Sequence, residues 1–551
     1  MAFWTTHPGN VFTRELGRNE ESFFRDLQFS TGTADLHMHA SISIHLPISS
    51  YDFQRAWLSV KALYPLLGAT VDNESLPPKF VVQEERLRSV LPGEILRSSI
   101  PSADEARRMA TALPNGPRKL SKNELARLTI LSQSDDASRV HVVISIGHLI
   151  TDGVGNASLL KEFLNFLATG ETRTTHDLAA RLSLAVAAES LVPSTRMSLP
   201  RQRWRHAAGS IISKIQDAKR TVNNTHMITI CSTCTQGGQT LPRSFGPIAT
   251  RQPARSAFFR TEFSPTESSD LIKSCRKHGI TFGNALPVLA QAGFARLLCR
   301  RYVRGDISQQ EWEFRKTQPY HSAGPQNIRP FLHKEWFEQG GRSNVTVNVG
   351  YFFFTLPYTP LGPATLAPGS AIPELGTLMS QPRFLLRCNM MKRQASRYLN
   401  HPLFFEVAAG RMEPRLERAR EMAMKWEADP ENYVLPTEVS KQNVSPIEQV
   451  NYGPINTHGW STFGNIYNEL ARTYPYQSTE KSLIQLLKYQ SFLHCRFGEL
   501  YLASGTSEGR LYWFVMYDNN VYTADIIEEW VGEIKQATRF YLGNQVVPSK
   551  L

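Results

Sequence analysis

The fold is decided by residues 140–153, which read Val140-His141-Val142-Val143-Ile144-Ser145-Ile146-Gly147-His148-Leu149-Ile150-Thr151-Asp152-Gly153. The even positions from 140 to 146 are all apolar, which is typical of a strand that packs on at least one face. Beyond the run, Asn156 or Ser158 is placed to cap a helix whose apolar stripe ends at Gly170. Residues 148–153 therefore lie on a strand–loop–helix corner, where functional side chains on a rigid scaffold are common.

Strands and helices are also predicted on both sides of this corner. On its N-terminal side, residues 14–30 indicate a helix, residues 35–48 a strand and residues 49–65 a helix, while residues 103–113 and 121–128 indicate two more helices. On its C-terminal side, Thr281 is placed to cap a helix. The segments that follow are a β-rich run at 345–356, helices at 383–399 and 411–426, and closing strands and a last helix at 511–518 and 521–527.

The length of 551 residues is too great for one ordinary hydrophobic core. We therefore expect a mixed α/β (α+β) protein with an N-terminal part at 1–192, a basic connection at 193–255 and a C-terminal part at 256–548. Apolar residues make up 41% of the chain and charged residues 20%, which is the balance of a globular enzyme.

The net charge of +12 indicates an anionic partner. Nucleic acid is disfavoured, because the positive residues are scattered and neither zinc-finger spacing nor an RNP-type aromatic motif is present. A phosphorylated co-substrate such as coenzyme A fits equally well. The densest positive segment spans residues 201–220 and reads as a solvated helix face, with contact to an anionic membrane surface or to CoA phosphates as the alternative. Its positive residues are Arg201, Arg203, Arg205, Lys214, Lys219 and Arg220.

Cysteine usage and the two termini bear on the compartment. Six cysteines do not make a disulfide framework, and no second Cys or His pair completes a zinc site with Cys231 and Cys234, which we read as plain thiols. The N-terminus lacks the layout of a signal peptide, and no run of 18 apolar residues predicts a membrane span. The last three residues, Ser549-Lys550-Leu551, match the address read by the peroxisomal import receptor.

The corner at 148–153 carries residue types suited to acyl transfer. Moving an acyl group from a thioester to an alcohol needs a base for the hydroxyl proton and an acid for the departing thiolate, and one histidine can serve as both. Asp152 is then placed to hold the loop by pairing with an arginine or with backbone groups. Gly153 leaves space where a side chain would block the substrate channel or the turn, so it is a candidate substrate-binding residue. About 0.03 chance matches to this spacing are expected in the chain, although a loop histidine that stabilises a turn is the alternative.

On these residues the chain resembles the HxxxDG acyltransferase superfamily, which includes alcohol acetyltransferases, plant BAHD enzymes and condensation domains of non-ribosomal peptide synthesis. Several other segments are similar to landmarks of that superfamily. They are Arg14-Glu15-Leu16-Gly17 with Glu20, Tyr64-Pro65-Leu66-Leu67-Gly68-Ala69, Thr281-Phe282-Gly283-Asn284-Ala285-Leu286 and Asn348-Val349-Gly350-Tyr351-Phe352.

The resemblance implies a two-lobed, chloramphenicol-acetyltransferase-like or BAHD-like fold, with mixed sheets flanked by helices and a tunnel between the lobes. It implies that His148 is the general base, that Asp152 is structural and that acyl-CoA is a co-substrate, with no bound cofactor or metal. Residues 459–464 resemble a landmark of the second lobe. A hydroxyl or backbone N–H of Ser461 or Thr462 would then stabilise the oxyanion, unless this segment is only a structural turn.

Two departures from the motifs of this superfamily narrow the choice among its branches. Condensation domains carry a second histidine where this chain has Gly147, and the Asp-Phe-Gly-Trp-Gly sequence of plant BAHD enzymes has no good copy here. The fungal alcohol acyltransferases, including trichothecene acetyltransferases, remain the best match. The terminal tripeptide adds a resemblance to peroxisomal enzymes that acylate mannosylerythritol lipids.

We therefore expect a monomeric O-acyltransferase that transfers an acyl group to a sugar, polyol or other secondary metabolite. A carrier-dependent condensation enzyme and a non-catalytic acyl- or lipid-binding protein are the alternatives.

Overall fold

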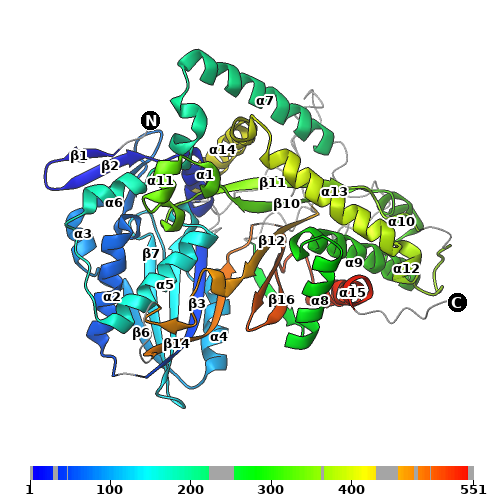
Figure 1. Cartoon of the computed structure of the whole chain (residues 1–551), viewed down its shortest axis with the longest axis horizontal. Helices are drawn as coiled ribbons and strands as arrows, with labels where there is room; N and C mark the ends of the chain where they lie inside the picture. Colours follow the sequence, from blue (N-terminus) through cyan, green and yellow to red (C-terminus); the bar gives the residue numbers. More distant parts are fainter. Residues whose placement is uncertain are drawn as a thin grey trace.

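Two lobes lie side by side, each built on a six-stranded sheet flanked by helices (Figure 1). The computed structural model describes residues 4–28, 35–45, 47–221, 254–361, 365–429, 457–476, 482–496 and 498–543. The predicted mixed α/β, two-lobed architecture is confirmed. In the described ranges, no helix is both long enough and apolar enough to cross a lipid bilayer.

The N-terminal lobe has a sheet in the order β13-β14-β3-β8-β7-β6. Its strands are β13 (Thr473–Tyr474), β14 (Ile484–Leu493), β3 (Asp35–Ile44), β8 (Arg139–Gly147), β7 (Ala126–Gln133) and β6 (Ile95–Ile100). All residues of β8 after the first are buried, as the apolar pattern predicts for a central strand. A smaller sheet joins β1 (Thr5–His7), β2 (Val11–Glu15), β5 (Lys79–Gln83) and β4 (Thr70–Asp72).

The helices of the N-terminal half surround this sheet (Figure 1). They are α1 (Arg18–Gln28), α2 (Ser50–Leu63), α3 (Glu84–Arg88), α4 (Ala103–Ala112), α5 (Gly153–Thr169) and α6 (Leu178–Leu184). The next helix, α7 (Leu199–Thr221), lies away from this sheet, along the upper edge of the molecule in Figure 1. The helix α5 packs beside α2 and ends, as predicted, at Gly170, whose positive φ of 75° suits a residue without a side chain.

The C-terminal lobe has a sheet in the order β11-β10-β12-β15-β16-β9. Its strands are β11 (Val349–Leu356), β10 (Tyr320–Asn327), β12 (His458–Asn465), β15 (Leu500–Ser507), β16 (Arg510–Asp518) and β9 (Ser256–Glu262). The helices are α8 (Pro265–Lys277), α9 (Phe282–Arg304), α10 (Gln309–Arg315), α11 (Lys334–Glu338), α12 (Leu375–Leu378), α13 (Gln381–Leu399), α14 (Phe404–Ala428) and α15 (Ala524–Leu542). Thr281 caps α9 as predicted, because its hydroxyl accepts from the Asn284 backbone N–H.

Three local predictions were wrong. Residues 126–128 begin strand β7 instead of ending a helix, because alternate side chains from Ala126 onward are buried where β7 pairs with β8. The first helix begins at Arg18, since residues 11–15 pair with β5 as strand β2. The helix after the corner begins at Gly153 and is capped by Asp152, so neither Asn156 nor Ser158 is its cap.

The C-terminal half of the chain also contributes to the N-terminal lobe. Strand β14 pairs with β3 along its whole length, and β13 pairs with β14. In Figure 1, β14 accordingly lies within the blue and cyan lobe. The predicted range 256–548 is therefore wrong as a single lobe, because a return strand completes the first sheet. Of the predicted connection at 193–255, residues 199–221 form α7 and residues 222–253 lie outside the described ranges.

Each lobe has its own hydrophobic core, and a third apolar cluster joins the two sheets. In this cluster Phe492 of β14 packs with Ala503, Phe514 and Met516 of the C-terminal sheet. The return strand β14 is thus one of the elements through which the two lobes contact each other.

Two buried histidines are expected to make the fold sensitive to acid. His37 is hydrogen-bonded to the Ser145 hydroxyl at 2.8 Å, and His39 to His141 at 3.0 Å. Burial lowers the pKa of His37 and of His39 to about 3, from an ordinary value of 6.5. Between these values the unfolded chain binds more protons than the folded chain, so stability is lost as pH falls. Each histidine contributes about 1.4 kcal/mol per pH unit in that window.

Neighbouring charges determine the net effect. His494 faces His37, and His141, Lys488 and Arg107 face His39, so each added proton would meet other positive groups. Asp35 acts in the opposite direction. Burial raises its pKa to about 6, so as pH falls the folded chain binds this proton more readily than the unfolded chain does.

The free energy of unfolding, measured in urea at about pH 7 and about pH 5, gives the sum of these opposing effects. We expect a clear loss of stability at the lower pH. In a His39→Gln variant the free energy of unfolding should change less between these two pH values. Equal stability at both pH values would contradict neutral, buried histidines.

Candidate active site

His148 lies where β8 ends and a single 3-10 turn, η4 (His148–Ile150), begins. Its Nδ1 is 2.8 Å from the carbonyl oxygen of Thr151. A carbonyl oxygen only accepts, so Nδ1 carries the proton and donates it. In the neutral ring the lone pair is then on Nε2, which is the atom available to accept a proton. The loop therefore selects the tautomer that a general base needs.

The surroundings of His148 keep the ring neutral and oriented. Burial lowers the pKa of His148 below its ordinary 6.5 and the charge of Arg496 lowers it further, while the charge of Asp152 and backbone hydrogen bonds act in the opposite direction. The ring of Phe23 on α1 stacks on the imidazole, with 4.0 Å between centroids and 8° between planes. The imidazole is thus unprotonated at neutral pH and held by contacts on one face and at Nδ1.

Asp152 does not hydrogen-bond to His148 and instead anchors the loop that carries it. Its Oδ1 accepts from the backbone N–H groups of Val154 and Gly155 at 3.1 and 3.0 Å, which caps α5. Arg329 donates to both carboxylate oxygens at 2.9 and 2.8 Å, and the Asn348 backbone N–H donates to Oδ2 at 2.8 Å. These are the arginine and backbone partners that the sequence predicts for this residue.

The Asp152–Arg329 pair also joins the lobes. Arg329 belongs to the turn that follows β10 of the C-terminal sheet, and its side chain is only 1% exposed. Its second amino group donates to the carbonyl oxygens of Asn344 and Thr346 at 3.0 Å each. Both side chains are buried, and they pair across the two lobes. Displacement of either side chain would therefore displace the loop at 148–153.

The structure brings the other predicted site residues close to this loop without linking them to the imidazole. A side-chain carbon on Gly153 would lie 3.4 Å from the ring of Phe463, so the end of β12 lies beside the start of α5. Ser461 is buried, and Thr462 lies against Gly283 at the start of α9. In the described part of the chain, neither hydroxyl is hydrogen-bonded to His148. Their role towards the oxyanion stays a prediction.

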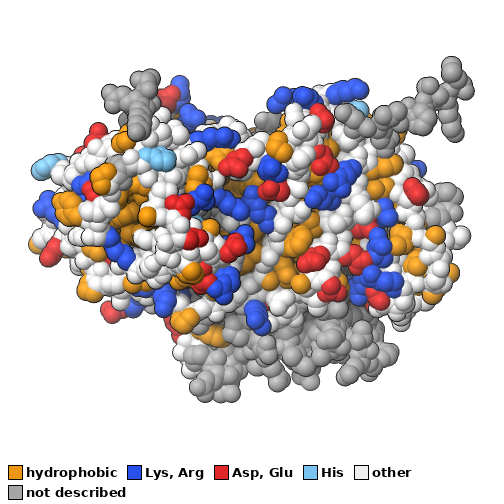
Figure 2. Space-filling model, turned by 90° about the horizontal axis from the view of Figure 1, so that it is seen from below, with side chains coloured by type: hydrophobic (Ala, Val, Ile, Leu, Met, Phe, Trp, Pro, Cys, Tyr) orange, Lys and Arg blue, Asp and Glu red, His pale blue; other side chains and the backbone are white. Residues whose placement is uncertain are grey.

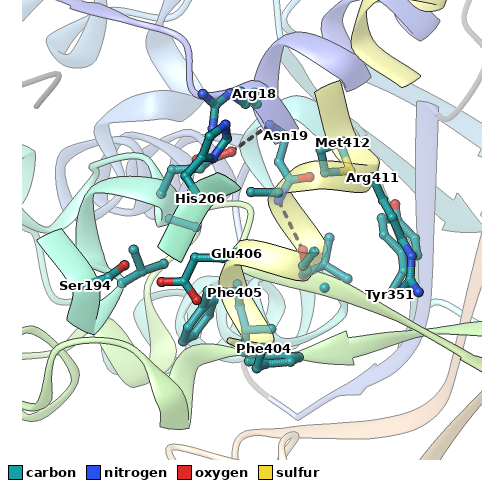
Figure 3. A pocket seen from close by; sticks show the side chains of 18 of the residues that line it. Arg18, Asn19, Ser194, His206, Tyr351, Phe404, Phe405, Glu406, Arg411 and Met412 are labelled. Atoms are coloured by element: carbon teal, nitrogen blue, oxygen red, sulfur yellow. Dashed lines mark hydrogen bonds between the residues drawn. The ribbon is translucent and has the colours of Figure 1, made fainter. Parts of the chain in front are cut away.

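A cavity of about 410 Å³ lies next to the site, between α1, α7, β11 and α14 (Figure 3). Its walls are largely apolar and aromatic, and arginines from three helices lie around it. The lining includes Tyr351, Phe353, Tyr398, Phe404, Phe405, Met412, Arg18, Arg203, Arg411 and Arg415. An apolar chain that carries a polar end fits this lining.

His148 does not line the cavity, but two side chains connect them. The Arg415 guanidinium lines the cavity and lies 5.8 Å from the centroid of Phe23, which stacks on His148. The same guanidinium lies 5.2 Å from the ring of Tyr351. A group that displaced the Arg415 side chain would therefore reach the ring that stacks on His148.

Polar groups line one side of the cavity. Asn19 donates through its backbone N–H to Glu189 at 2.9 Å and through its side chain to the Val349 carbonyl at 3.2 Å, as the dashed lines in Figure 3 show. Burial raises the pKa of the Glu189 carboxyl, and the charge of Glu20 adds to that effect. The Glu189 carboxyl is therefore less readily ionised than an exposed glutamate.

Positive side chains do not gather into a single patch on the face that Figure 2 shows, where Lys and Arg are mixed with Asp and Glu. Many of the arginines are in ion pairs, such as Arg304 with Glu529 and Arg420 with Glu21. In the described residues, no group of His, Cys, Asp and Glu is arranged to hold a metal ion. Cys231 and Cys234 lie outside those residues.

Solved structures resemble this arrangement over nearly the whole chain. The trichothecene 15-O-acetyltransferase of Fusarium sporotrichioides aligns over 98% of both chains with a TM-score of 0.67 at 13% identity. The chain has the condensation-domain and acetyltransferase fold. The condensation domain of the Monacolin K polyketide synthase aligns over 96% of this chain and 97% of its own, with a TM-score of 0.58 at 10% identity. No family model and no curated protein sequence matches the chain.

The first condensation domain of the calcium-dependent antibiotic synthetase has the same fold, with a TM-score of 0.55 at 11% identity over 96% of both chains. The condensation-domain and acetyltransferase fold confirms the two lobes that the His148–Gly153 motif predicts. At these identities the likeness establishes the fold, and the chemistry has to be argued from the site itself.

Proposed function

We propose that the protein is an acyl-CoA-dependent O-acyltransferase in which His148 removes the proton from an acceptor hydroxyl. The observation that carries this proposal is the hydrogen bond from Nδ1 to the Thr151 carbonyl, which leaves the lone pair on Nε2. A lowered pKa keeps that lone pair available at neutral pH.

In the proposed reaction the acceptor oxygen attacks the thioester carbonyl as its proton moves to Nε2. The tetrahedral intermediate then collapses, the C–S bond breaks and the imidazolium returns the proton to the departing thiolate. The products are one ester and one free CoA. Nδ1 stays hydrogen-bonded to Thr151 throughout, so the imidazolium is stabilised by a fixed dipole. Asp152 takes no proton and keeps the loop in register.

The proposed acceptor is a sugar, polyol glycolipid or similar secondary metabolite, of which mannosylerythritol lipid is one example. The cavity that Arg415 lines supports an amphiphilic acceptor, because its aromatic walls suit an apolar chain and its polar side chains suit a hydroxyl-bearing head. The peroxisomal address at 549–551 lies outside the described residues and stays a prediction, as does the monomeric state.

A carrier-dependent condensation reaction is the second candidate, because condensation domains share the fold. Gly147 stands where those domains carry a second histidine, which favours the ester-forming alternative. A binding protein without catalysis would have no need for the selected tautomer of His148. The identity of the donor separates these candidates.

Mass spectrometry of products from mixed acyl-CoA and polyol acceptors tests the proposal. We expect ester products in a one-to-one ratio with released CoA, since the reaction balances in that way. The matched incubation replaces free acyl-CoA with the same acyl group on a phosphopantetheine carrier protein. Product formation only with the acylated carrier protein would support a condensation enzyme. If neither donor gives a product, the result would support a binding protein.

A further inference from the structure

The helix α7 packs against the helix α14. It runs along the upper edge of the molecule in Figure 1, next to α14. The two helices approach closely, because a side-chain carbon on Gly209 would lie 2.5 Å from the backbone of Glu406. Ion pairs Arg205–Glu406 at 2.8 Å and Arg411–Asp217 at 3.2 Å strengthen the contact. The side of α7 that faces α14 is therefore packed.

The opposite side of α7 presents large apolar side chains to solvent. Trp204 is 66% exposed, Ile211 60% and Ile215 54%. Spacings of seven and four residues place these three side chains within about 40° of each other around the helix. Single exposed apolar residues are ordinary, but an aligned stripe of a tryptophan and two isoleucines indicates a surface that is covered in use.

Positive side chains border this stripe on both sides. Arg203 and Lys214 lie on one flank of the helix and Arg201 on the other, and all three are exposed. None of them forms an ion pair with a residue in the described ranges of the chain. An apolar stripe between cations, on a helix too polar to span a bilayer, is the arrangement of helices that lie in a membrane interface.

We propose that the exposed face of α7 docks the protein on an anionic lipid surface. Trp204, Ile211 and Ile215 insert at the level of the lipid headgroups, and the three cations pair with lipid phosphate and carboxylate groups. A second copy of the chain fits this face less well, because a two-fold contact between two such helices would bring like charges together.

The helix α7 also borders the cavity. Its residues Leu199, Gln202, Arg203 and His206 line the cavity, and Leu199 is 57% exposed. Figure 3 shows His206 at this wall. The docking surface itself does not depend on the proposed acyl transfer, so its test uses binding alone.

Co-sedimentation of the full chain with vesicles tests the apolar stripe. We expect binding to phosphatidylcholine vesicles that contain phosphatidylserine, and a loss of about tenfold or more in the Ile211→Ser, Ile215→Ser double variant. The matched control is Leu386→Ser on α13, because Leu386 is also 54% exposed but lies outside α7. An equal loss in the control variant, or no loss in the double variant, would overturn the proposal.

Two further experiments test the role of the positive charges and the depth to which Trp204 inserts into the bilayer. Replacing Arg201, Arg203 and Lys214 with Gln should weaken binding about fivefold for each charge removed and abolish the preference for phosphatidylserine. Brominated lipids should quench tryptophan fluorescence in the wild-type protein, and Trp204→Phe should remove that quenching. No preference for anionic vesicles, or self-association through α7 without vesicle binding, would overturn the proposal.

Discussion

Replacement of His148 by alanine is expected to lower the rate of acyl transfer by a factor of about 10² to 10⁴ while the protein stays folded. The imidazole is the group whose Nε2 is prepared to take the hydroxyl proton, and the variant has no base at that position. The rate of free CoA release in the presence of acceptor measures the effect. Since the side chain is partly exposed and carries no structural ion pair, the change in stability should be small.

The matched control is His7→Ala. His7 is exposed and hydrogen-bonded to Thr13 at the edge of the small sheet. Its removal should leave the rate unchanged. A His148→Ala variant that is folded and retains most of the wild-type rate would contradict the mechanism.

Arg329→Met is expected to produce the largest loss of stability, about 3–5 kcal/mol, because it leaves the Asp152 carboxylate buried without its cation. Turnover should also fall, since the loop that carries His148 loses its link to the second lobe. Asp152→Asn should act in the same direction through the unpaired guanidinium. The double variant should be less damaged than the sum of the single variants, since each single change leaves a lone buried charge.

Urea unfolding and kcat of the three variants give this double-mutant cycle. Arg196→Met is the control, because Arg196 forms an ion pair with Glu335 in which both side chains are more than half exposed, and little change is expected. If the losses in free energy of unfolding of the Asp152 and Arg329 variants simply add in the double variant, the two residues do not act as a pair.

Local patterns were sufficient to predict the centre of the fold. The apolar even positions of 140–146 predicted a buried strand, and the residues after it predicted the strand–loop–helix corner that carries His148. The helix cap at Thr281 and the helix end at Gly170 were also predicted, because both depend on side-chain or backbone properties of a single residue.

Contacts between distant segments could not be predicted in this way. The sequence predicts that Asp152 pairs with an arginine or with backbone groups, but nothing near position 329 distinguishes Arg329 from the other arginines. Phe23 is one of 29 phenylalanines, and only the packing of α1 against the loop places it on the imidazole. The pairing of β14 with β3 joins residues more than 400 positions apart, so no local pattern reveals it.

The pH dependence of kcat/KM tests the central claim, a neutral His148 acting as base, most directly. Protonation of Nε2 abolishes the base, so the rate is lost as pH falls through the pKa of the imidazole. Because burial holds that pKa below 6.5, we expect a plateau at neutral pH and a single acidic limb below 6.5. A rate that continues to rise well above neutral pH, with no plateau, would mean that another group takes the proton.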